Sequence, residues 1–294
     1  MNVGFVGLGI MGKPMAKNIL KAGYRVIVYD FNEKAMDEVV ECGAEKGNSG
    51  KDVAEKAEVV ITMLPNSPNV KAALFNENGI FEGLSTGKTV IDMSSIAPKA
   101  SQEFAEKLSR KGVNFLDAPV SGGEPKAIDG TIAVMVGGNE DVFEQYKDLL
   151  STMSGSVTRV GEVGAGNITK LANQMIVAVN IAAISEAYSL AKKANVDPEA
   201  VYNAIRTGLA GSTVMDQKSK KIFTGDWNPG FRIELHIKDL QNALDTSHDV
   251  NVSTPFTSLA MDILLSLKAH GYEKEDHSAI ARYYEMINNQ FLQN

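Results

Sequence analysis

The chain has 294 residues, of which 44% are hydrophobic and 22% are charged, and its 29 basic and 36 acidic side chains give a formal charge of −7. This acidic balance excludes the basic surface that binds nucleic acids or anionic membranes. The length favours two domains over one. Because Cys42 is the only cysteine, no intrachain disulfide can form. We therefore expect a reducing, cytoplasmic compartment, with Cys42 as a small core side chain.

The N-terminus enters a strand-like run directly, without the charged region of a secretory signal. The apolar segment Met175–Ile184 is too short to span a bilayer and contains Asn180. We expect no membrane partner, no nucleic-acid partner and no metal.

Short β-branched runs alternate with helical patterns through the first half of the chain, which is typical of parallel βαβ units. Helices are expected between most of these runs, for example over Pro98–Lys111 and Glu140–Leu150. The expected strands are Asn2–Gly7, Arg25–Asp30, Glu58–Leu64, Lys88–Ser94, Asn114–Pro119, Thr131–Gly137 and Ser156–Gly161.

Beyond Gly166 the strand pattern ends and long helix-period segments follow, broken at Asp197-Pro198, Asn228-Pro229-Gly230 and Thr254-Pro255. A single helix over Gly166–Lys193 would be roughly 40 Å long. The sequence therefore predicts a Rossmann-type α/β domain over residues 1–163 and an all-α domain over residues 164–294, joined by this long helix.

A glycine-rich turn, Gly7-Leu8-Gly9-Ile10-Met11-Gly12, lies between the first expected strand and the helix that follows it. In a dinucleotide-binding turn of this pattern, the first glycine allows the tight turn and the second lets the backbone approach a pyrophosphate. The third lets helix and strand pack closely, and the helix N-terminus faces the phosphates. The flanking strand and helix support this interpretation.

Asp30 ends the second expected strand, about 20 residues beyond the glycine turn, where a ribose-binding carboxylate belongs. Such a carboxylate accepts from both ribose hydroxyls of NAD and repels the 2′-phosphate of NADP. An ordinary strand-end aspartate is the alternative, and the nearby Arg25 and Lys34 weaken the exclusion of NADP(H). NAD(H) is favoured and NADP(H) stays possible.

Two further loops follow expected strands, at the sheet edge where parallel sheets bind ligands. The loop after Glu58–Leu64 places Leu64, Pro65 and Asn69 near the adenine or ribose, and the loop after Lys88–Ser94 places Ser94 and Ser95 near the nicotinamide. For each loop alone, helix capping is an equal alternative.

The loop after Asn114–Pro119 contains Ser121-Gly122-Gly123, which offers a hydroxyl and unshielded backbone N–H groups. These groups suit a carboxylate if the loop folds as an anion nest. A flexible turn is the alternative.

Lys170 lies near the start of the long helix with Asn173 three residues further on, on the same side, and with Gln174 at i+4. We expect Gly166, at i−4, to leave that side open for another body to approach. An ammonium among apolar neighbours is costly to bury without a partner, which a substrate oxygen would supply. Lys170 is thus a candidate general acid and Asn173 its orienting neighbour; a lysine that reaches solvent is the alternative.

Lys238 and Asp239 form a candidate ion pair in the second half, and Lys238 could close over the nicotinamide. An exposed pair of little energetic value is the alternative. His236 is a rival general acid because its intrinsic pKa lies near neutrality.

Four motifs, in order along the chain, resemble those of the β-hydroxyacid dehydrogenase family, which includes 3-hydroxyisobutyrate dehydrogenase. They are GFVGLGIMGKPMAKNI, DAPVSGG, GNITKLANQ and KDLQNALD, and the resemblance covers essentially the whole chain. Longer stretches such as ITMLPNSPNVK and FRIELHIKDL are most similar to the tartronate semialdehyde reductases of that family.

The resemblance implies that Ser121, Gly122 and Gly123 bind the substrate carboxylate and that Lys170 is the catalytic acid/base, with Asn173 beside it. It also implies a homo-oligomer, a dimer or tetramer, formed largely through the helical domain. The cofactor-binding residues that it implies are Gly7, Leu8, Gly9, Ile10, Met11, Gly12, Asp30, Leu64, Pro65, Asn69, Ser95 and Lys238.

The expected reaction is the NAD(H)-dependent reduction of tartronate semialdehyde to glycerate, within a substrate class of small carboxylate-bearing aldehydes and hydroxy acids. Dehydrogenation of 3-hydroxyisobutyrate or 4-hydroxybutyrate is the alternative within the family. Phosphogluconate dehydrogenases share the lysine and asparagine but have a larger helical domain. A catalytically silent dinucleotide-binding scaffold is the alternative from another class.

Overall fold

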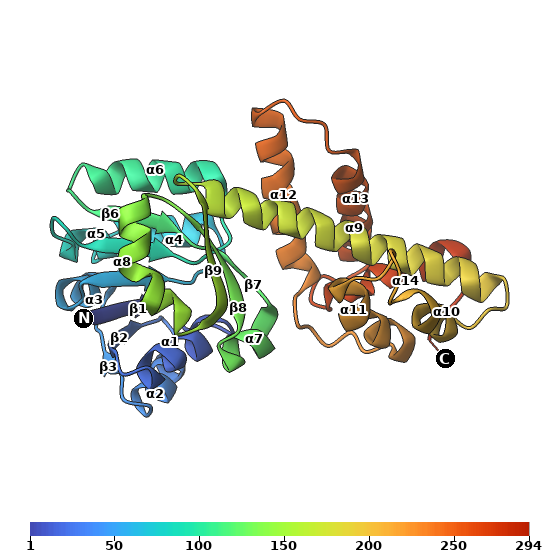
Figure 1. The fold of residues 1–294 in the computed structure, drawn as a ribbon, viewed down its shortest axis with the longest axis horizontal. Helices are drawn as coiled ribbons and strands as arrows, with labels where there is room; N and C mark the ends of the chain where they lie inside the picture. The colour runs from blue at the N-terminus through green and yellow to red at the C-terminus, as the bar shows by residue number, and fades with distance from the viewer. Residues whose placement is uncertain (294) are drawn as a thin grey trace. The chain divides into compact units, whose positions relative to one another are not determined.

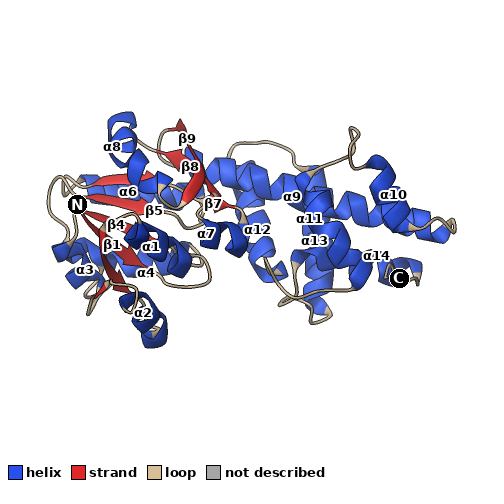
Figure 2. Ribbon diagram, turned by 60° about the horizontal axis from the view of Figure 1, so that its bottom comes forward, coloured by secondary structure: helices blue, strands red, loops and turns tan. Residues whose placement is uncertain are grey.

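The computed structural model describes residues 1–293. The chain divides into two compact units, the first from Met1 to Lys170 and the second from Leu171 onward. All the strands lie in the first unit, whereas the second unit is helical (Figure 2). This architecture confirms the predicted fold class, an α/β Rossmann-type domain followed by an all-α domain.

The first unit contains one nine-stranded sheet with the order β3-β2-β1-β4-β5-β6-β8-β7, in which β9 pairs with β8 (Figure 1). Because β1 lies between β2 and β4, the connections leave it in opposite directions, which creates a crevice at the carboxyl ends of β1 and β4. The strands are β1 (Asn2–Val6), β2 (Arg25–Tyr29), β3 (Glu45–Lys46), β4 (Val59–Thr62), β5 (Thr89–Asp92), β6 (Asn114–Asp117), β7 (Val120–Ser121), β8 (Ile132–Gly137) and β9 (Ser154–Gly161).

Two strands depart from the predicted parallel βαβ pattern. β8 runs antiparallel to β6 and β7, and β9, which is parallel to β8, shares the reversed direction. The reason is that the connection from β7 to β8, which contains helix α7 (Gly123–Asp129), is shorter than the dozen or more residues that a parallel crossover needs. The two-residue strands β3 and β7 are too short to show a pattern in the sequence and were not predicted.

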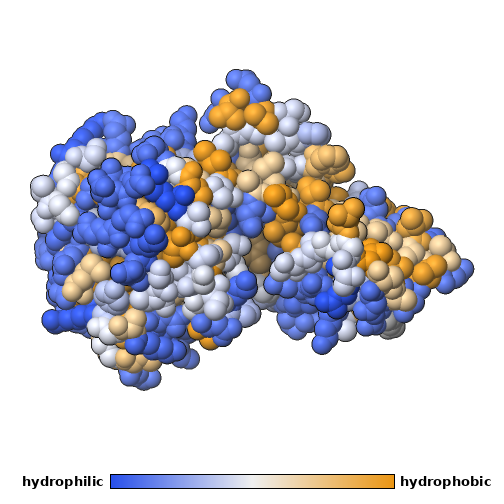
Figure 3. All heavy atoms as spheres, in the orientation of Figure 1, coloured by the Kyte–Doolittle hydropathy of each residue, from blue (hydrophilic) through white to orange (hydrophobic). Residues whose placement is uncertain are grey.

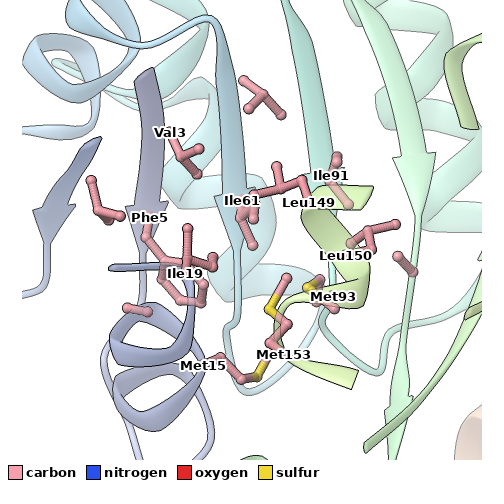
Figure 4. Close-up of a cluster of buried hydrophobic side chains, with 14 of the residues drawn as sticks. Val3, Phe5, Met15, Ile19, Ile61, Ile91, Met93, Leu149, Leu150 and Met153 are labelled. Carbon is pink, nitrogen blue, oxygen red and sulfur yellow. The ribbon is translucent and has the colours of Figure 1, made fainter. Parts of the chain in front are cut away.

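Helices cover both faces of the sheet, and alternate strand residues point to opposite layers. In β1, Val3 and Phe5 join one core and Val6 joins the other. The first core, part of which is shown in Figure 4, is closed by helices α1, α2 and α8, and the second by α3, α4 and α6. The helices not yet given bounds in this unit are α1 (Gly12–Lys21), α2 (Glu33–Val40), α3 (Gly50–Lys56), α4 (Ser67–Phe75), α5 (Ile80–Gly83), α6 (Pro98–Ser109) and α8 (Glu140–Ser151).

Cys42 does not belong to either core. It lies just after α2 and is exposed, and its Sγ contacts the carbonyl oxygen of Glu38 at 3.5 Å. The expectation of a buried cysteine is therefore wrong, because the residue falls in the turn that ends the helix and not on its apolar face.

Helix α9 (Ala165–Lys193) begins in the first unit and continues into the second, close to the predicted long helix. By length and composition alone it is long and apolar enough to cross a bilayer. The segment Met175–Ile184, which the sequence analysis considered too short to span a bilayer, is only the middle part of this longer helix. A core helix of a soluble protein has the same properties, and α9 buries Asn167, Lys170 and Gln174.

The second unit is built on the remainder of α9 and the helices that follow. Two of its helices begin at predicted breaks: Asp197 caps the first of them, and Thr254 precedes Pro255 at the start of another. Its buried apolar residues form two clusters, one around Leu240 and Leu264 and one around Tyr188 and Phe223. The elements are α10 (Pro198–Ile205), α11 (Thr213–Thr224), α12 (Ile233–Asp249), α13 (Pro255–Ala269), the 3₁₀ helix η1 (His277–Ala279) and α14 (Ile280–Asn288).

Candidate active site

The glycine turn follows β1 at the crevice between β1 and β4. Gly7 has a φ of +100°, where a side chain would be strained, and a Cβ at Gly12 would collide with the carbonyl oxygen of Gly7. A Cβ at Gly9, in contrast, would meet no protein atom within 4 Å. The protein itself therefore has no need of a bare backbone at Gly9, and the open space above it fits a dinucleotide pyrophosphate.

Asp30 lies directly beside this turn. Its Oδ2 accepts a hydrogen bond of 2.6 Å from the backbone N–H of Leu8, and its Oδ1 accepts one of 2.8 Å from Asn32. Each carboxylate oxygen has further lone pairs, so the side chain can still accept from ribose hydroxyls. The nearby Arg25 is paired with Glu45 at 3.1 Å.

A hydrogen bond from the Leu64 N–H to Ser94 Oγ, at 2.8 Å, joins the loops after β4 and β5. Ser94 is completely buried, so its hydroxyl supports the neighbouring loop and is not exposed to a ligand. Ser95 is half-buried, and Asn69 is exposed in the first turn of α4, where Asn66 is the capping residue. Capping thus accounts for Asn66, whereas Asn69 lies exposed in the same turn.

Gly122 and Gly123 follow β7 and have φ values of +144° and +72°. Such conformations favour glycine and turn successive backbone N–H groups in directions that an ordinary strand does not allow. Gly122 precedes helix α7, and Ser121 beside it is half-buried. The loop therefore has a defined, glycine-dependent conformation.

A buried carboxylate that the sequence analysis did not single out holds the start of α9. Asp117, at the end of β6, accepts from the backbone N–H of Gly164 with Oδ1 (2.7 Å) and from that of Asn167 with Oδ2 (2.8 Å). Burial raises the pKa of the Asp117 carboxyl, and these N–H donors act in the opposite direction. Asp117 therefore serves as the cap of α9.

Gly166 has a different role from the one expected. A Cβ there would lie 2.5 Å from the carbonyl oxygen of Met135 and 2.6 Å from that of Asp117. The expectation that this glycine opens the helix to another body is wrong, because the glycine instead allows α9 to pack against β6 and β8.

The Lys170 side chain does not extend to bulk solvent. The residue is only 7% exposed, although it carries an ammonium group and lies within the second turn of α9. The alternative of a lysine that reaches water at the helix start is therefore not what the structure shows. A buried ammonium retained at such a position is a common feature of functional sites.

In the second unit, Asn173 and Lys238 belong to one hydrogen-bonded chain. Asn173 Nδ2 donates to Gln174 Oε1 at 2.9 Å, and Gln174 Nε2 donates to Asp239 Oδ2 at 2.7 Å. Asp239 Oδ1 lies 3.1 Å from Lys238 Nζ. Since Asp239 is 1% exposed, this ion pair is not the exposed pair considered as the alternative.

His236 is completely buried, and both its ring nitrogens are engaged within the second unit. Nε2 lies 3.1 Å from the backbone oxygen of Gln174, and Nδ1 lies 3.0 Å from Nδ1 of His277. A carbonyl oxygen can only accept, so a neutral His236 donates from Nε2, and His277 must then donate from its Nδ1. These contacts disfavour His236 as the rival proton donor.

The other buried carboxyl of the sheet is Asp92, which lies opposite Asp117 in the register of β5 and β6. Its Oδ1 accepts from Thr62 Oγ1 at 2.8 Å and from the Ser94 N–H at 3.1 Å. Its Oδ2 has no hydrogen-bond partner among the described residues. Burial raises the pKa of this carboxyl to about 7.

Sequence reasoning passed over Asp92, Asp117, Asn167 and His277. A signal was present for two of them, because Asp117 is a charged residue within an expected strand and Asn167 lies in the first turn of the helix that carries Lys170. No sequence signal joins His277 to His236, which lies 41 residues away. Among residues 1–293, no group of three or more His, Cys, Asp or Glu side chains is placed to hold a metal ion.

Two family models match the chain. The NAD binding domain of 6-phosphogluconate dehydrogenase matches residues 2–161, and the NAD-binding domain of NADP-dependent 3-hydroxyisobutyrate dehydrogenase matches residues 164–284. The 2-hydroxy-3-oxopropionate reductase of Escherichia coli K12 is 40% identical over 292 residues, which cover 99% of this chain and 100% of that protein.

Human mitochondrial 3-hydroxyisobutyrate dehydrogenase is 36% identical over 288 residues, covering 96% of this chain and 86% of that protein. The crystal structure of 3-hydroxyisobutyrate dehydrogenase from Salmonella typhimurium has a TM-score of 0.86 at 31% identity, covering 96% of this chain and 99% of that one.

The fold and the matches over both halves define an NAD(P)-dependent oxidoreductase that acts on hydroxyl groups. The chain belongs to the β-hydroxyacid dehydrogenase family, of the 3-hydroxyisobutyrate dehydrogenase type. The family resemblance predicted from the sequence is thereby confirmed.

Proposed function

We propose that the protein reduces tartronate semialdehyde to glycerate with NADH, and that Lys170 is the general acid. The observation that carries this proposal is the burial of Lys170 in α9, in a unit that also contains the glycine turn and the Ser121–Gly123 loop. The name of the Escherichia coli relative, 2-hydroxy-3-oxopropionate reductase, supports the substrate.

A bound nicotinamide dinucleotide supplies the hydride for the aldehyde carbon. Lys170 Nζ donates a proton to the carbonyl oxygen, so that the aldehyde gains two hydrogens and becomes the primary alcohol of glycerate. Asn173 orients the reacting group. In the reverse direction, neutral Lys170 accepts the hydroxyl proton.

The Ser121–Gly123 loop holds the substrate carboxylate through the Ser121 hydroxyl and the backbone N–H groups. The left-handed conformations of Gly122 and Gly123 support this assignment. Holding the carboxylate at one end and the carbonyl at the other orients a small acid, and such orientation lowers the barrier by roughly 7–11 kcal/mol in favourable cases.

The cofactor proposed is NAD(H), with NADP(H) as the alternative. Asp30 supports NAD(H), because a carboxylate beside the glycine turn repels a 2′-phosphate. The residues that the family resemblance assigns to the cofactor are Gly7, Leu8, Gly9, Ile10, Met11, Gly12, Asp30, Leu64, Pro65, Asn69, Ser95 and Lys238.

We further propose a cytoplasmic homo-oligomer, a dimer or tetramer, that assembles through the second unit. Exposed apolar side chains support a second copy as the occupant, including Ile176 on α9 at 66% exposure and Phe256 on α13 at 72%. Both line an apolar groove of about 820 Å³. Apolar side chains are visible over this unit in Figure 3. Larger exposed apolar patches mark protein interfaces.

The experiment is a comparison of NADH oxidation with tartronate, methylmalonate and succinate semialdehydes. The proposal predicts the highest kcat/KM for tartronate semialdehyde. A higher value for methylmalonate or succinate semialdehyde would instead assign the chain to 3-hydroxyisobutyrate or 4-hydroxybutyrate. If the protein binds NADH but none of the three semialdehydes causes NADH oxidation, the result would favour a catalytically silent dinucleotide-binding scaffold.

A further inference from the structure

Asp117 connects two segments that the proposed function uses together. Its backbone ends β6 and leads directly into the loop that contains Ser121, Gly122 and Gly123. Its carboxylate oxygens accept separately from Gly164 and from Asn167, on either side of the first residue of α9. One buried residue thus ties the expected carboxylate-binding loop to the helix that carries Lys170.

Asn167 ties the same turn of α9 to the loop after β5. Its Oδ1 accepts from the Ile96 N–H at 3.1 Å, and its Nδ2 donates to Ser101 Oγ on α6 at 3.1 Å. Asn167 is completely buried, and Lys170 follows it by three residues. Because Ile96 is the neighbour of Ser95, this link relates the helix to an expected cofactor-binding loop.

Two glycines leave room for the Asp117 clamp, by which we mean the hydrogen bonds from Gly164 and Asn167 to the Asp117 carboxylate. A Cβ at Gly137, the residue of β8 that pairs with Asp117, would collide with Asp117 Oδ1. A Cβ at Gly166 would lie 2.6 Å from the Asp117 carbonyl oxygen. Asp117 is therefore closely packed against β8 at Gly137 and against α9 at Gly166, and neither position has room for a side chain.

We propose that Asp117, assisted by Asn167, is a positioning residue that fixes the place of Lys170 relative to the Ser121–Gly123 loop. The inference rests on the proposed function. In a small oxo acid only a few bonds separate the carboxylate from the carbonyl oxygen, so the enzyme must hold its two binding groups at one separation. A misplacement of about 1 Å can cost roughly 100-fold in rate.

The test variant is Asp117→Asn, which keeps the shape but replaces one acceptor oxygen by an NH₂ group that faces an N–H donor. At least one of the two bonds to α9 is lost. The matched control is Asp92→Asn, which alters a buried carboxyl at the end of the adjacent strand, where its hydrogen bonds go to Thr62 and Ser94.

For Asp117→Asn we expect kcat with tartronate semialdehyde to fall at least ~10-fold, while the Kd for NADH stays within about twofold of the wild-type value. The control should keep kcat within about threefold. If Asp117→Asn folds poorly, Asn167→Ala is the second test variant. It removes the side-chain bonds of Asn167 to Ile96 and Ser101, and alanine is compatible with the helix. It should show the same loss of kcat without a loss of NADH affinity. The inference is overturned if Asp117→Asn keeps its kcat, if the control loses as much, or if NADH affinity falls in parallel with kcat.

Amide hydrogen exchange of the protein without substrate gives a readout that does not depend on the reaction. Loss of the cap should speed exchange over Gly164–Lys170, measured relative to exchange in β1 of the same variant, by about 5-fold or more in Asp117→Asn but not in Asp92→Asn. If exchange changes as expected but the wild type reduces no oxo acid, the clamp stands and the proposed function fails. If the wild type is active and exchange over this segment is unchanged, the inference fails and the function stands.

Discussion

Asp92 makes the stability of the first unit depend on pH in a direction opposite to that of most aspartates. The side chain is completely buried, and its Oδ2 lacks a hydrogen-bond partner among residues 1–293. The protonated form leaves the two bonds at Oδ1 intact, whereas the ionised form places a charge in the sheet. Burial accordingly raises the pKa of Asp92 from 3.8 to about 7.

The sign follows from proton linkage. Between about pH 4 and pH 7 the folded unit keeps a proton that the unfolded chain releases, so the free energy of unfolding decreases as the pH rises through this window. Above pH 7 the loss is complete, and a pKa difference of about three pH units corresponds to roughly 4 kcal/mol at most. Asp92→Asn imitates the protonated acid and removes this dependence, at a cost of about 1–3 kcal/mol for a buried NH₂ group without a partner.

The assay is amide hydrogen exchange in β4 and β5 at pH 5 and pH 8, corrected for the intrinsic exchange rates. Exchange reports on the first unit, whereas the only tryptophan, Trp227, lies in the second. We expect Asp92→Asn to be less stable than the wild type at pH 5 and equally or more stable at pH 8. Asp148→Asn, which alters an exposed residue on α8, is the control and should leave the pH dependence unchanged. A wild-type-to-variant difference that is the same at both pH values refutes the reasoning.

Two further predictions concern substrate and cofactor. Ser121→Ala should raise the KM for the oxo acid about 10-fold and change kcat less than about threefold, because it removes one hydrogen bond to a charged group; steady-state kinetics checks this, and an unchanged KM argues against the carboxylate-binding loop. The wild type should prefer NADH over NADPH by about 10-fold or more in kcat/KM, since Asp30 opposes a 2′-phosphate; a higher value with NADPH removes Asp30 from its assigned role.

The sequence was sufficient for features that depend on local pattern. The alternation in β1 and the glycine spacing that follows it predicted the first βα unit, and the proline breaks at Asp197-Pro198 and Thr254-Pro255 predicted helix starts. Lys170 was predicted to be functional because an ammonium group among apolar helix residues is costly to bury without a partner. Its burial agrees with that argument.

Features that depend on contacts between distant segments were not predictable. The reversal of β8 follows from the short connection between β7 and β8, which becomes visible only when β7 is known. Gly166 was interpreted as an opening because its neighbours β6 and β8 are not apparent from the helix sequence. The cap formed by Asp117 spans 47 residues to Gly164, and no local pattern encodes such a pairing.

The central claim is tested most directly by Lys170→Ala in rapid-mixing single turnover with NADH and tartronate semialdehyde. The account predicts a rate constant for hydride transfer at least ~100-fold below that of the wild type, with an unchanged Kd for NADH, because only the proton donor is removed. Lys192→Ala, near the other end of α9, is the matched control and should react at the wild-type rate. Hydride transfer in Lys170→Ala within a few-fold of the wild-type rate would contradict the account.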